Sequence, residues 1–187
     1  GLQVPDDVTL IWCDDNYGYI RHFPTAEERA RKGGNGIYYH VSYWGRPHDY
    51  LWLGTFSPYL LHQQMKLAYD RGIQKMWVLN VGDIKPAEYQ IELFLDMAWN
   101  IDEVNEIGVT AHLKSWLGRE FGSNCAEELL PAMEAHYQLS YIRKPEFMGN
   151  TREEERDPKY KVIKDLPWSE QTISERLRSY TVLSDVV

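Results

Sequence analysis

Ile37-Tyr38-Tyr39-His40-Val41-Ser42-Tyr43 and Met76-Trp77-Val78-Leu79 are two apolar runs that flank a stretch with clear helix signals. That stretch opens with Ser57 and Pro58, and Gly72 follows its last residue. A serine N-cap, a proline in the first turn and a glycine after the last turn predict a helix. Two strands joined through a helix are expected to lie parallel, with a right-handed crossover.

The same pattern extends in both directions along the chain. Val8-Thr9-Leu10-Ile11-Trp12-Cys13 is a third apolar run. Between it and the next strand, residues 24–32 carry Thr25 and Glu28 in the spacing of a capping box, which predicts a short helix. Helical periodicity also covers residues 86–100. The first hundred residues therefore alternate between strand and helix.

The second half of the chain is predicted to be helical. Apolar periodicity predicts helices over residues 110–118 and 124–143. Asn124 is the expected N-cap of the longer helix, and Pro131 is expected to bend it.

Three parallel strands are too few to close an eight-stranded barrel, and too few for a usual doubly wound sheet. The chain also begins without a methionine. We therefore expect an α/β protein that forms the later part of a larger catalytic domain. Residues 1–149 are assigned to that part. Residues 150–187 are assigned to a charged linker and an amphipathic helix that follows Ser169.

Composition narrows the function classes. The 187 residues carry a net charge of -8, which argues against a broad nucleic-acid or anionic-membrane surface. No apolar stretch is long enough to span a membrane. Aromatic residues make up 13% of the chain, and many lie beside polar clusters. Such enrichment suits a sugar-binding cleft, although an aromatic core would have the same composition.

Several sequence motifs are excluded. Gly33-Gly34-Asn35-Gly36 precedes a strand, so it predicts a turn and not a phosphate-binding loop. No GxSxG or HExxH motif is present, so neither a serine hydrolase of that type nor a catalytic zinc is expected. Cys13 and Cys125 are lone cysteines, and Cys13 is expected to be a small buried hydrophobe. We expect no cofactor and no metal ion.

All three apolar runs end in polar side chains. In parallel sheets the carboxyl ends of the strands meet at one edge, where active sites form. Three polar strand endings therefore predict one face of an active site. The candidates follow the three strands in turn: Asp14, Asp15 and Asn16; His40 and Tyr43; and Asn80, Asp83 and Lys85.

Asp14-Asp15-Asn16-Tyr17-Gly18 is the sharpest of these clusters. If the strand continues, Asp14 and Asn16 share a face, which offers a carboxylate beside an amide for acid-base chemistry or for a hard cation. The alternative is an Asx turn closed by Gly18, which needs no catalytic function.

The other candidates have similar alternatives. His40 lies near a strand end, where it can contact a substrate or serve as a satisfied core residue. Lys85 can bind a substrate carboxylate or form an ion pair with Asp83 or Glu88. The loop that carries Arg46, His48 and Asp49 has functional side-chain types, but loops are commonly polar without function.

The chain resembles the xylan α-1,2-glucuronidases of glycoside hydrolase family 115. The similarity is dense over roughly the first hundred residues and continues into the helical half. It rests on the following motifs: Val8-Thr9-Leu10-Ile11-Trp12 with Asp14-Asp15-Asn16-Tyr17-Gly18-Tyr19-Ile20, the run from Tyr39 to Trp52, Asn80-Val81-Gly82-Asp83-Ile84-Lys85-Pro86, and Tyr141-Ile142-Arg143-Lys144-Pro145-Glu146-Phe147-Met148.

The resemblance implies a (β/α)8 barrel whose C-terminal part, with three parallel strands, lies in this chain before an α-helical segment. It implies hydrolysis of α-1,2-linked (4-O-methyl)glucuronic acid from glucuronoxylan with inversion, by two carboxyl groups roughly 6.5–9.5 Å apart. By motif, Asp14 is the catalytic candidate and Asn16, His40 and Tyr43 line the uronate site. Asp15, Asn80, Asp83 and Lys85 match family motifs with roles inferred from position.

The resemblance also implies that an essential carboxylate lies outside this chain, so the chain alone is predicted to be inactive. A homodimer of the full-length protein and a periplasmic or extracellular location are expected on the same ground. Two other functions stay open: a metal-dependent barrel hydrolase that uses Asp14, Asn16 and Asp83 as ligands, and a non-catalytic carbohydrate-binding segment.

Overall fold

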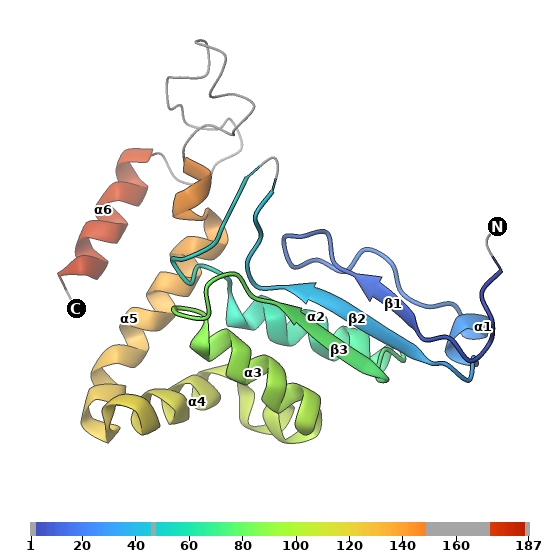
Figure 1. The fold of residues 1–187 in the computed structure, drawn as a ribbon. Helices are drawn as coiled ribbons and strands as arrows, with labels where there is room; N and C mark the ends of the chain where they lie inside the picture. The colour runs from blue at the N-terminus through green and yellow to red at the C-terminus, as the bar shows by residue number, and fades with distance from the viewer. Residues whose placement is uncertain (1–2, 46–47, 149–172, 186–187) are drawn as a thin grey trace, which may run out of the picture.

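A computed structural model describes residues 3–45, 48–148 and 173–185. Three strands form one parallel sheet in the order β1 (Leu10–Cys13), β2 (Asn35–His40) and β3 (Met76–Asn80). The register places Cys13 opposite Tyr38 and His40 opposite Asn80. The predicted α/β class with three parallel strands is therefore confirmed (Figure 1).

The helices between the strands begin where the capping signals predicted. α1 (Ala26–Arg29) has the complete capping box between Thr25 and Glu28. α2 (Pro58–Asp70) begins after Ser57, whose hydroxyl accepts a hydrogen bond from the Leu60 amide. α3 (Glu88–Trp99) follows β3.

The helical half differs from its prediction in length. α4 (Ile101–Phe121) follows its N-cap Asn100, whose side chain accepts a hydrogen bond from the Glu103 amide, and Gly108 interrupts the helix with φ 77°. Because this interruption breaks the helical periodicity of the apolar residues, the sequence predicted only the part of the helix after it. α5 (Ser123–Ile142) begins after Gly122, so the assignment of Asn124 as N-cap was wrong, and Pro131 lies inside the helix.

Two short elements complete the described chain. The 3-10 helix η1 (Pro145–Met148) follows α5, and α6 (Ile173–Ser184) packs against α5. The predicted linker over residues 150–166 lies outside the described residues. None of the described helices combines the length and the apolar character that crossing a membrane requires.

The two faces of the sheet have different surroundings. Ile37 and Tyr39 are fully buried in the core with residues of α2 and α3, whereas Ile11 and Met76 are about half exposed. Figure 1 shows α2 and α3 on one side of the sheet. Cys13 shares the exposed face, so its predicted burial was wrong.

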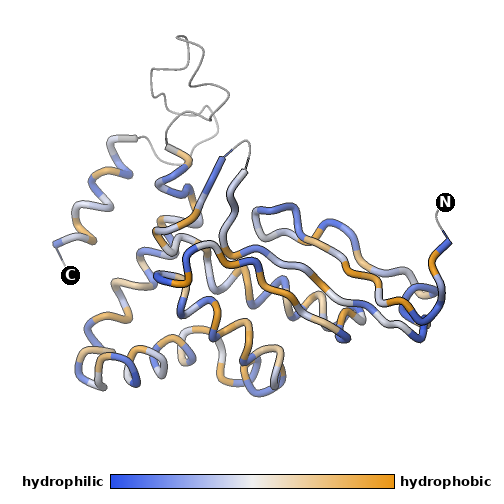
Figure 2. The backbone as a smooth tube through the Cα atoms, in the orientation of Figure 1, coloured by the Kyte–Doolittle hydropathy of each residue, from blue (hydrophilic) through white to orange (hydrophobic). Residues whose placement is uncertain are grey.

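The start of β2 corrects a second expectation. Asn35 and Gly36 belong to the strand, and the turn occupies only the residues before them. A side chain at Gly36 would lie 2.5 Å from the Met76 carbonyl, so glycine allows β2 and β3 to approach. Figure 2 shows hydrophobic segments in β1 and β3, while β2 is paler because its tyrosines score as moderately polar although Tyr39 is buried.

Candidate active site

Asp14 and His40 form a buried pair at the carboxyl edge of the sheet. His40 is the last residue of β2, and Asp14 follows the last residue of β1. His40 Nδ1 lies 2.6 Å from Asp14 Oδ1, and the exposed fractions of the two side chains are 7% and 0%. A carboxylate at Nδ1 fixes the tautomer of the imidazole and leaves Nε2 for another partner.

The second oxygen of Asp14 organises the loop that follows. Asp14 Oδ2 accepts a hydrogen bond from the Gly18 amide at 2.9 Å. Gly18 has φ +92°, and a Cβ there would lie 2.4 Å from the Phe56 ring, so both the conformation and the space require glycine. The Asx turn that the sequence offered as an alternative is formed by the next residue, since Asp15 Oδ1 accepts a hydrogen bond from the amide of Tyr17, two residues further on.

Asp15 and Asn16 have structural contacts in the same loop. Asp15 Oδ1 accepts from the amides of Tyr17 and Tyr19, and Asp15 Oδ2 pairs with Arg21 at 2.8 Å. Asn16 has φ 69°, so the strand alternation that would have placed its side chain beside Asp14 ends at Cys13.

Two buried tyrosines fix the loop that follows Asp14 through hydrogen bonds to its backbone. The Tyr39 hydroxyl donates to the Gly18 carbonyl at 2.7 Å, and the Tyr50 hydroxyl donates to the Asn16 carbonyl at 2.6 Å. Burial raises the pKa of both tyrosines, and the negative charge of Asp14 raises it further. Both hydroxyls therefore stay protonated and donate, and the loop is fixed in place.

A second polar contact joins β2 to β3 at the same edge. The Asn80 amide donates to the Tyr38 hydroxyl. Tyr38 also packs edge-on against His40, with ring centroids 4.7 Å apart. Sequence reasoning missed Tyr38, although the two-residue period of a strand places it on the face of His40.

Tyr43 extends the aromatic wall around His40. Its ring lies edge-on to His40 at 5.7 Å and to Tyr17 at 5.8 Å. Its backbone pairs with Tyr50, which closes the loop between them. The structure therefore brings together four of the predicted residues, Asp14, His40, Tyr43 and Asn80. Asn80 is joined to His40 through Tyr38.

The loop beyond Tyr43 is held by η1, the 3-10 helix that follows α5. His48 stacks on Phe147 with ring centroids 4.8 Å apart, and the Gly45 amide donates to Asp49. Arg46 lies outside the described residues. Phe147 was not predicted, because nothing in a sequence signals a contact over about a hundred residues.

Lys144, in the segment between α5 and η1, also contacts the loop between β2 and α2. Its ammonium donates to the Thr55 carbonyl at 2.6 Å and lies 5.0 Å from the centre of the Tyr50 ring. Burial lowers the pKa of Lys144 to about 8, and the carboxylate of Glu146 opposes this shift. Glu146 itself accepts from the Thr55 hydroxyl.

Asp83 and Lys85 lie on the exposed loop after β3. The Lys85 side chain is 88% exposed, and its ammonium lies 3.2 Å from Glu88, which is the ion pair that the sequence offered as the alternative. Their predicted contact with substrate stays a prediction.

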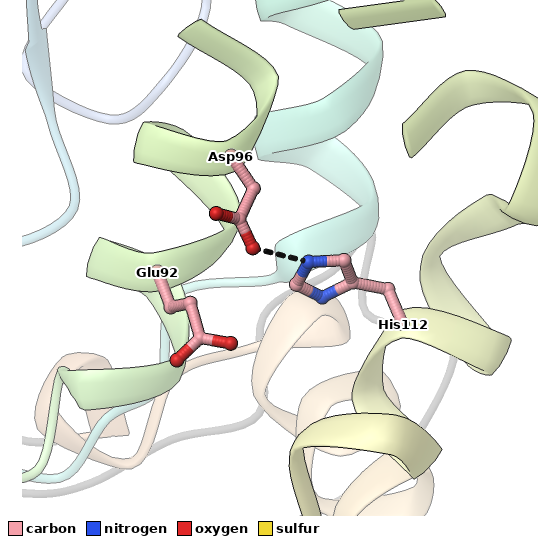
Figure 3. Close-up of side chains that lie close together, drawn as sticks. All are labelled: Glu92, Asp96 and His112. Carbon is pink, nitrogen blue, oxygen red and sulfur yellow. Dashed lines mark hydrogen bonds and ion pairs between the residues drawn. The ribbon is translucent and has the colours of Figure 1, made fainter. Parts of the chain in front are cut away.

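Figure 3 shows another polar cluster, away from the sheet edge, where Glu92 and Asp96 of α3 face His112 of α4. Their ligand atoms lie within 4.8 Å of one another, a spacing that a metal ion can draw together. However, His112 Nε2 bonds Asp96 at 3.0 Å, and Arg119 bonds both oxygens of Glu92 at 2.8 and 2.6 Å. These ion pairs join α3 to α4, and a structural role of this kind explains why the three side chains lie together.

Helices on one face of a parallel sheet, with polar side chains at its carboxyl edge, define an α/β protein of the class that builds its active site beyond the strands. Within this class, the profile of glycosyl hydrolase family 115 matches residues 1–147. The chain belongs to this family.

A solved structure supports the assignment. It is described as a novel family GH115 4-O-methyl-α-glucuronidase, BtGH115A, with specificity for decorated arabinogalactans. Its sequence is 75% identical to the chain, with a TM-score of 0.91 over 100% of the chain. The chain spans 24% of the length of that structure. No curated protein matches the chain.

Proposed function

We propose that this chain is part of an inverting α-glucuronidase that removes α-1,2-linked (4-O-methyl)glucuronic acid from a plant polysaccharide. The observation that carries the proposal is the 2.6 Å contact between Asp14 and His40 at the carboxyl edge of the sheet. Family membership supports the reaction class.

In this proposal Asp14 acts through His40. Both Asp14 oxygens accept hydrogen bonds inside the protein, from His40 and from Gly18, and its side chain has no exposed surface. A carboxylate held in this way is suited to orient an imidazole and to stabilise its charged form. Asp14 is then a positioning residue, and His40 Nε2 is the group that contacts the uronate or the reacting water.

The substrate-binding surface is proposed to continue from this pair along the sheet edge. Tyr43 and Tyr38 supply aromatic faces for the sugar ring, and Asn80 supplies an amide. Asn16 is proposed to reach the same sugar from the partly exposed loop after Asp14. Asp15, Asp83 and Lys85 are assigned to its margin.

Inversion needs an acid and a base on opposite sides of the scissile bond, roughly 6.5–9.5 Å apart. Asp15 is a weak candidate for the second group, because its oxygens already bind two amides and Arg21. We therefore propose that the partner carboxylate belongs to another part of a longer enzyme, and that the 187-residue chain alone is inactive. Dimerisation of that longer enzyme remains a prediction.

Release of glucuronic acid tests the proposal. A longer family 115 enzyme that contains this chain is incubated with glucuronoxylan and, separately, with glucuronidated arabinogalactan, and the anomer released is followed by proton NMR. Immediate release of the β-anomer supports inversion, and the preferred polymer identifies the substrate. Release of the α-anomer, or of no uronic acid from either polymer, contradicts the proposal. Hydrolysis by the isolated chain contradicts its predicted inactivity.

A further inference from the structure

A hollow of about 610 Å³ lies between the first two turns of α2 and the second half of α5. Its volume falls within the range of roughly 300–1,000 Å³ that is typical of small-molecule sites. In Figure 1 the amino end of α2 lies beside α5, and a hydrogen bond of 2.8 Å from Tyr59 to Glu134 joins the two helices there.

Tyrosine rings form the walls of this hollow. Tyr59 and Tyr141 are 40% and 56% exposed, whereas Tyr137 is buried. The hydroxyls are held in place, since Tyr59 contacts both Thr110 and Glu134 and the Tyr141 oxygen lies 3.3 Å from that of Tyr19. Fixed rings with an apolar face and a polar edge suit the alternating C–H and O–H surfaces of a sugar.

Two carboxamides supply further polar groups. Gln63 comes from α2 and Gln138 from α5, and both side chains are exposed. Within the described chain, neither carboxamide takes part in the hydrogen bonds that tie the two helices together. Each carboxamide offers an acceptor and two donors, which is what sugar hydroxyls require.

The charge of the hollow restricts its ligand. Glu134 is the one carboxylate among its described lining residues, and no lysine, arginine or histidine is found among them. A uronate would be repelled by this carboxylate, whereas a hydroxyl can donate to it. This lining therefore suits an uncharged saccharide better than a uronate.

The hollow is connected to the candidate active site through Tyr141, Tyr19 and Asp15. α2 starts after the loop that leaves the carboxyl end of β2, so Ser57 and Tyr59 lie toward the edge that carries His40. Tyr19, the partner of Tyr141, also donates its amide to Asp15 in the loop that follows Asp14. A polymer that presents a branch at the active site can extend an uncharged part toward this hollow.

We propose that the hollow between α2 and α5 is a second carbohydrate-binding site, which takes an uncharged segment of the polysaccharide through Tyr59, Tyr141, Gln63 and Gln138. This site is additional to the proposed hydrolysis, and its function is binding alone.

Titration of the isotopically labelled chain by NMR tests the proposal. The probes are xylotetraose and an arabinogalactan oligosaccharide freed of glucuronic acid, each up to about 10 mM, the range of weak binding. We expect one of them to produce saturable shifts of the side-chain amide signals of Gln63 and Gln138. Free glucuronic acid is expected to produce no such shift.

Matched variants locate the binding. Gln63→Ala and Tyr141→Ala should each raise the dissociation constant by about tenfold, equivalent to about 1.4 kcal/mol. Tyr141→Phe, which keeps the ring, should stay closer to the original value. Gln74→Ala, an exposed glutamine in the loop between α2 and β3, is the control and should bind normally. Equal binding by Gln63→Ala and the parent chain, or no saturable shift with either probe, overturns the proposal.

The same titration of a longer enzyme that contains the chain decides whether the hollow stays open there. Retained affinity supports the site, and loss of binding overturns it, because another segment then fills the space. The probes contain no uronate and no bond is cleaved, so a failure of the proposed hydrolysis leaves this result unchanged.

Discussion

Asp14 Oδ1 lies 2.6 Å from His40 Nδ1, although the two residues are 26 positions apart and belong to neighbouring strand ends. The contact exists because β1 and β2 are parallel and in a register that brings their carboxyl ends together. Its burial isolates the carboxylate from water, so the pair behaves as one unit.

Asp14→Asn is expected to reduce the kcat/KM of a longer family 115 enzyme by about 100-fold or more, because the imidazole loses its charged partner. His40→Asn should cause a similar loss. The double variant should be hardly slower than either single variant, since both remove the same unit. Rates are measured on the release of glucuronic acid.

Asp70→Asn is the control for this experiment, because Asp70 is an exposed acid at the end of α2 that pairs with Lys66. Its activity should be unchanged. Near-normal activity of Asp14→Asn would remove Asp14 from the mechanism. Fully additive losses in the double variant would show that the two residues act independently.

Gly18→Ala is expected to destabilise the chain by about 2 to 4 kcal/mol, from its left-handed backbone and from the clash with Phe56. Gly118→Ala is the matched change inside α4, where the nearest atom to the new Cβ is 3.9 Å away. It should stabilise by about 0.5–1 kcal/mol. Urea unfolding of both variants measures the difference, and equal effects would contradict this account of the loop.

Two substitutions of Asp15 separate the contribution of its turn from that of its ion pair to the free energy of unfolding. Asp15→Ala removes the acceptor for two backbone amides and should cost about 1–2 kcal/mol. Asp15→Asn keeps an oxygen for those amides and loses only the charge opposite the exposed Arg21, so it should cost less than about 1 kcal/mol. The free energy of unfolding is again the measurement. Equal losses for the two variants would mean that the charge, and not the turn, is what matters.

The lowered pKa of Lys144 predicts that the stability of the chain depends on pH. Burial lowers its pKa in the folded chain to about 8, below the ordinary value of 10.5. Between these two values the unfolded chain binds more protons than the folded chain, so stability rises with pH across this window. Below pH 8 both states are protonated and the cost of burying the charge is fully present.

The comparison with Lys144→Met isolates this contribution, because the other titrating groups are the same in both proteins. The free energy of unfolding of the parent chain, relative to the variant, should rise by about 3 kcal/mol at most between pH 8 and pH 10.5. Denaturant unfolding at several pH values measures it. A flat difference would show that Lys144 titrates normally.

Much of the fold could be predicted because it depends on local signals. The helix from Pro58 to Asp70 begins and ends at its serine, proline and glycine, and the capping box of α1 forms as expected. By contrast, the kink at Gly108 concealed half of α4, since a break in periodicity reads as a loop. The exposure of Cys13 was also out of reach, because an apolar residue does not reveal which face of its strand is covered.

For the candidate site, the sequence by itself determined which residues stand at the strand ends, among them Asp14, His40 and Asn80, because the ends of apolar runs are marked in the chain. Only the tertiary structure decided how they are used. It paired Asp14 with His40, and it turned Asp15 toward Arg21 and backbone amides. It also brought Phe147 against His48 and Lys144 against Thr55, each from about a hundred residues away. Such partners depend on register and packing between distant segments, and no local pattern encodes either one.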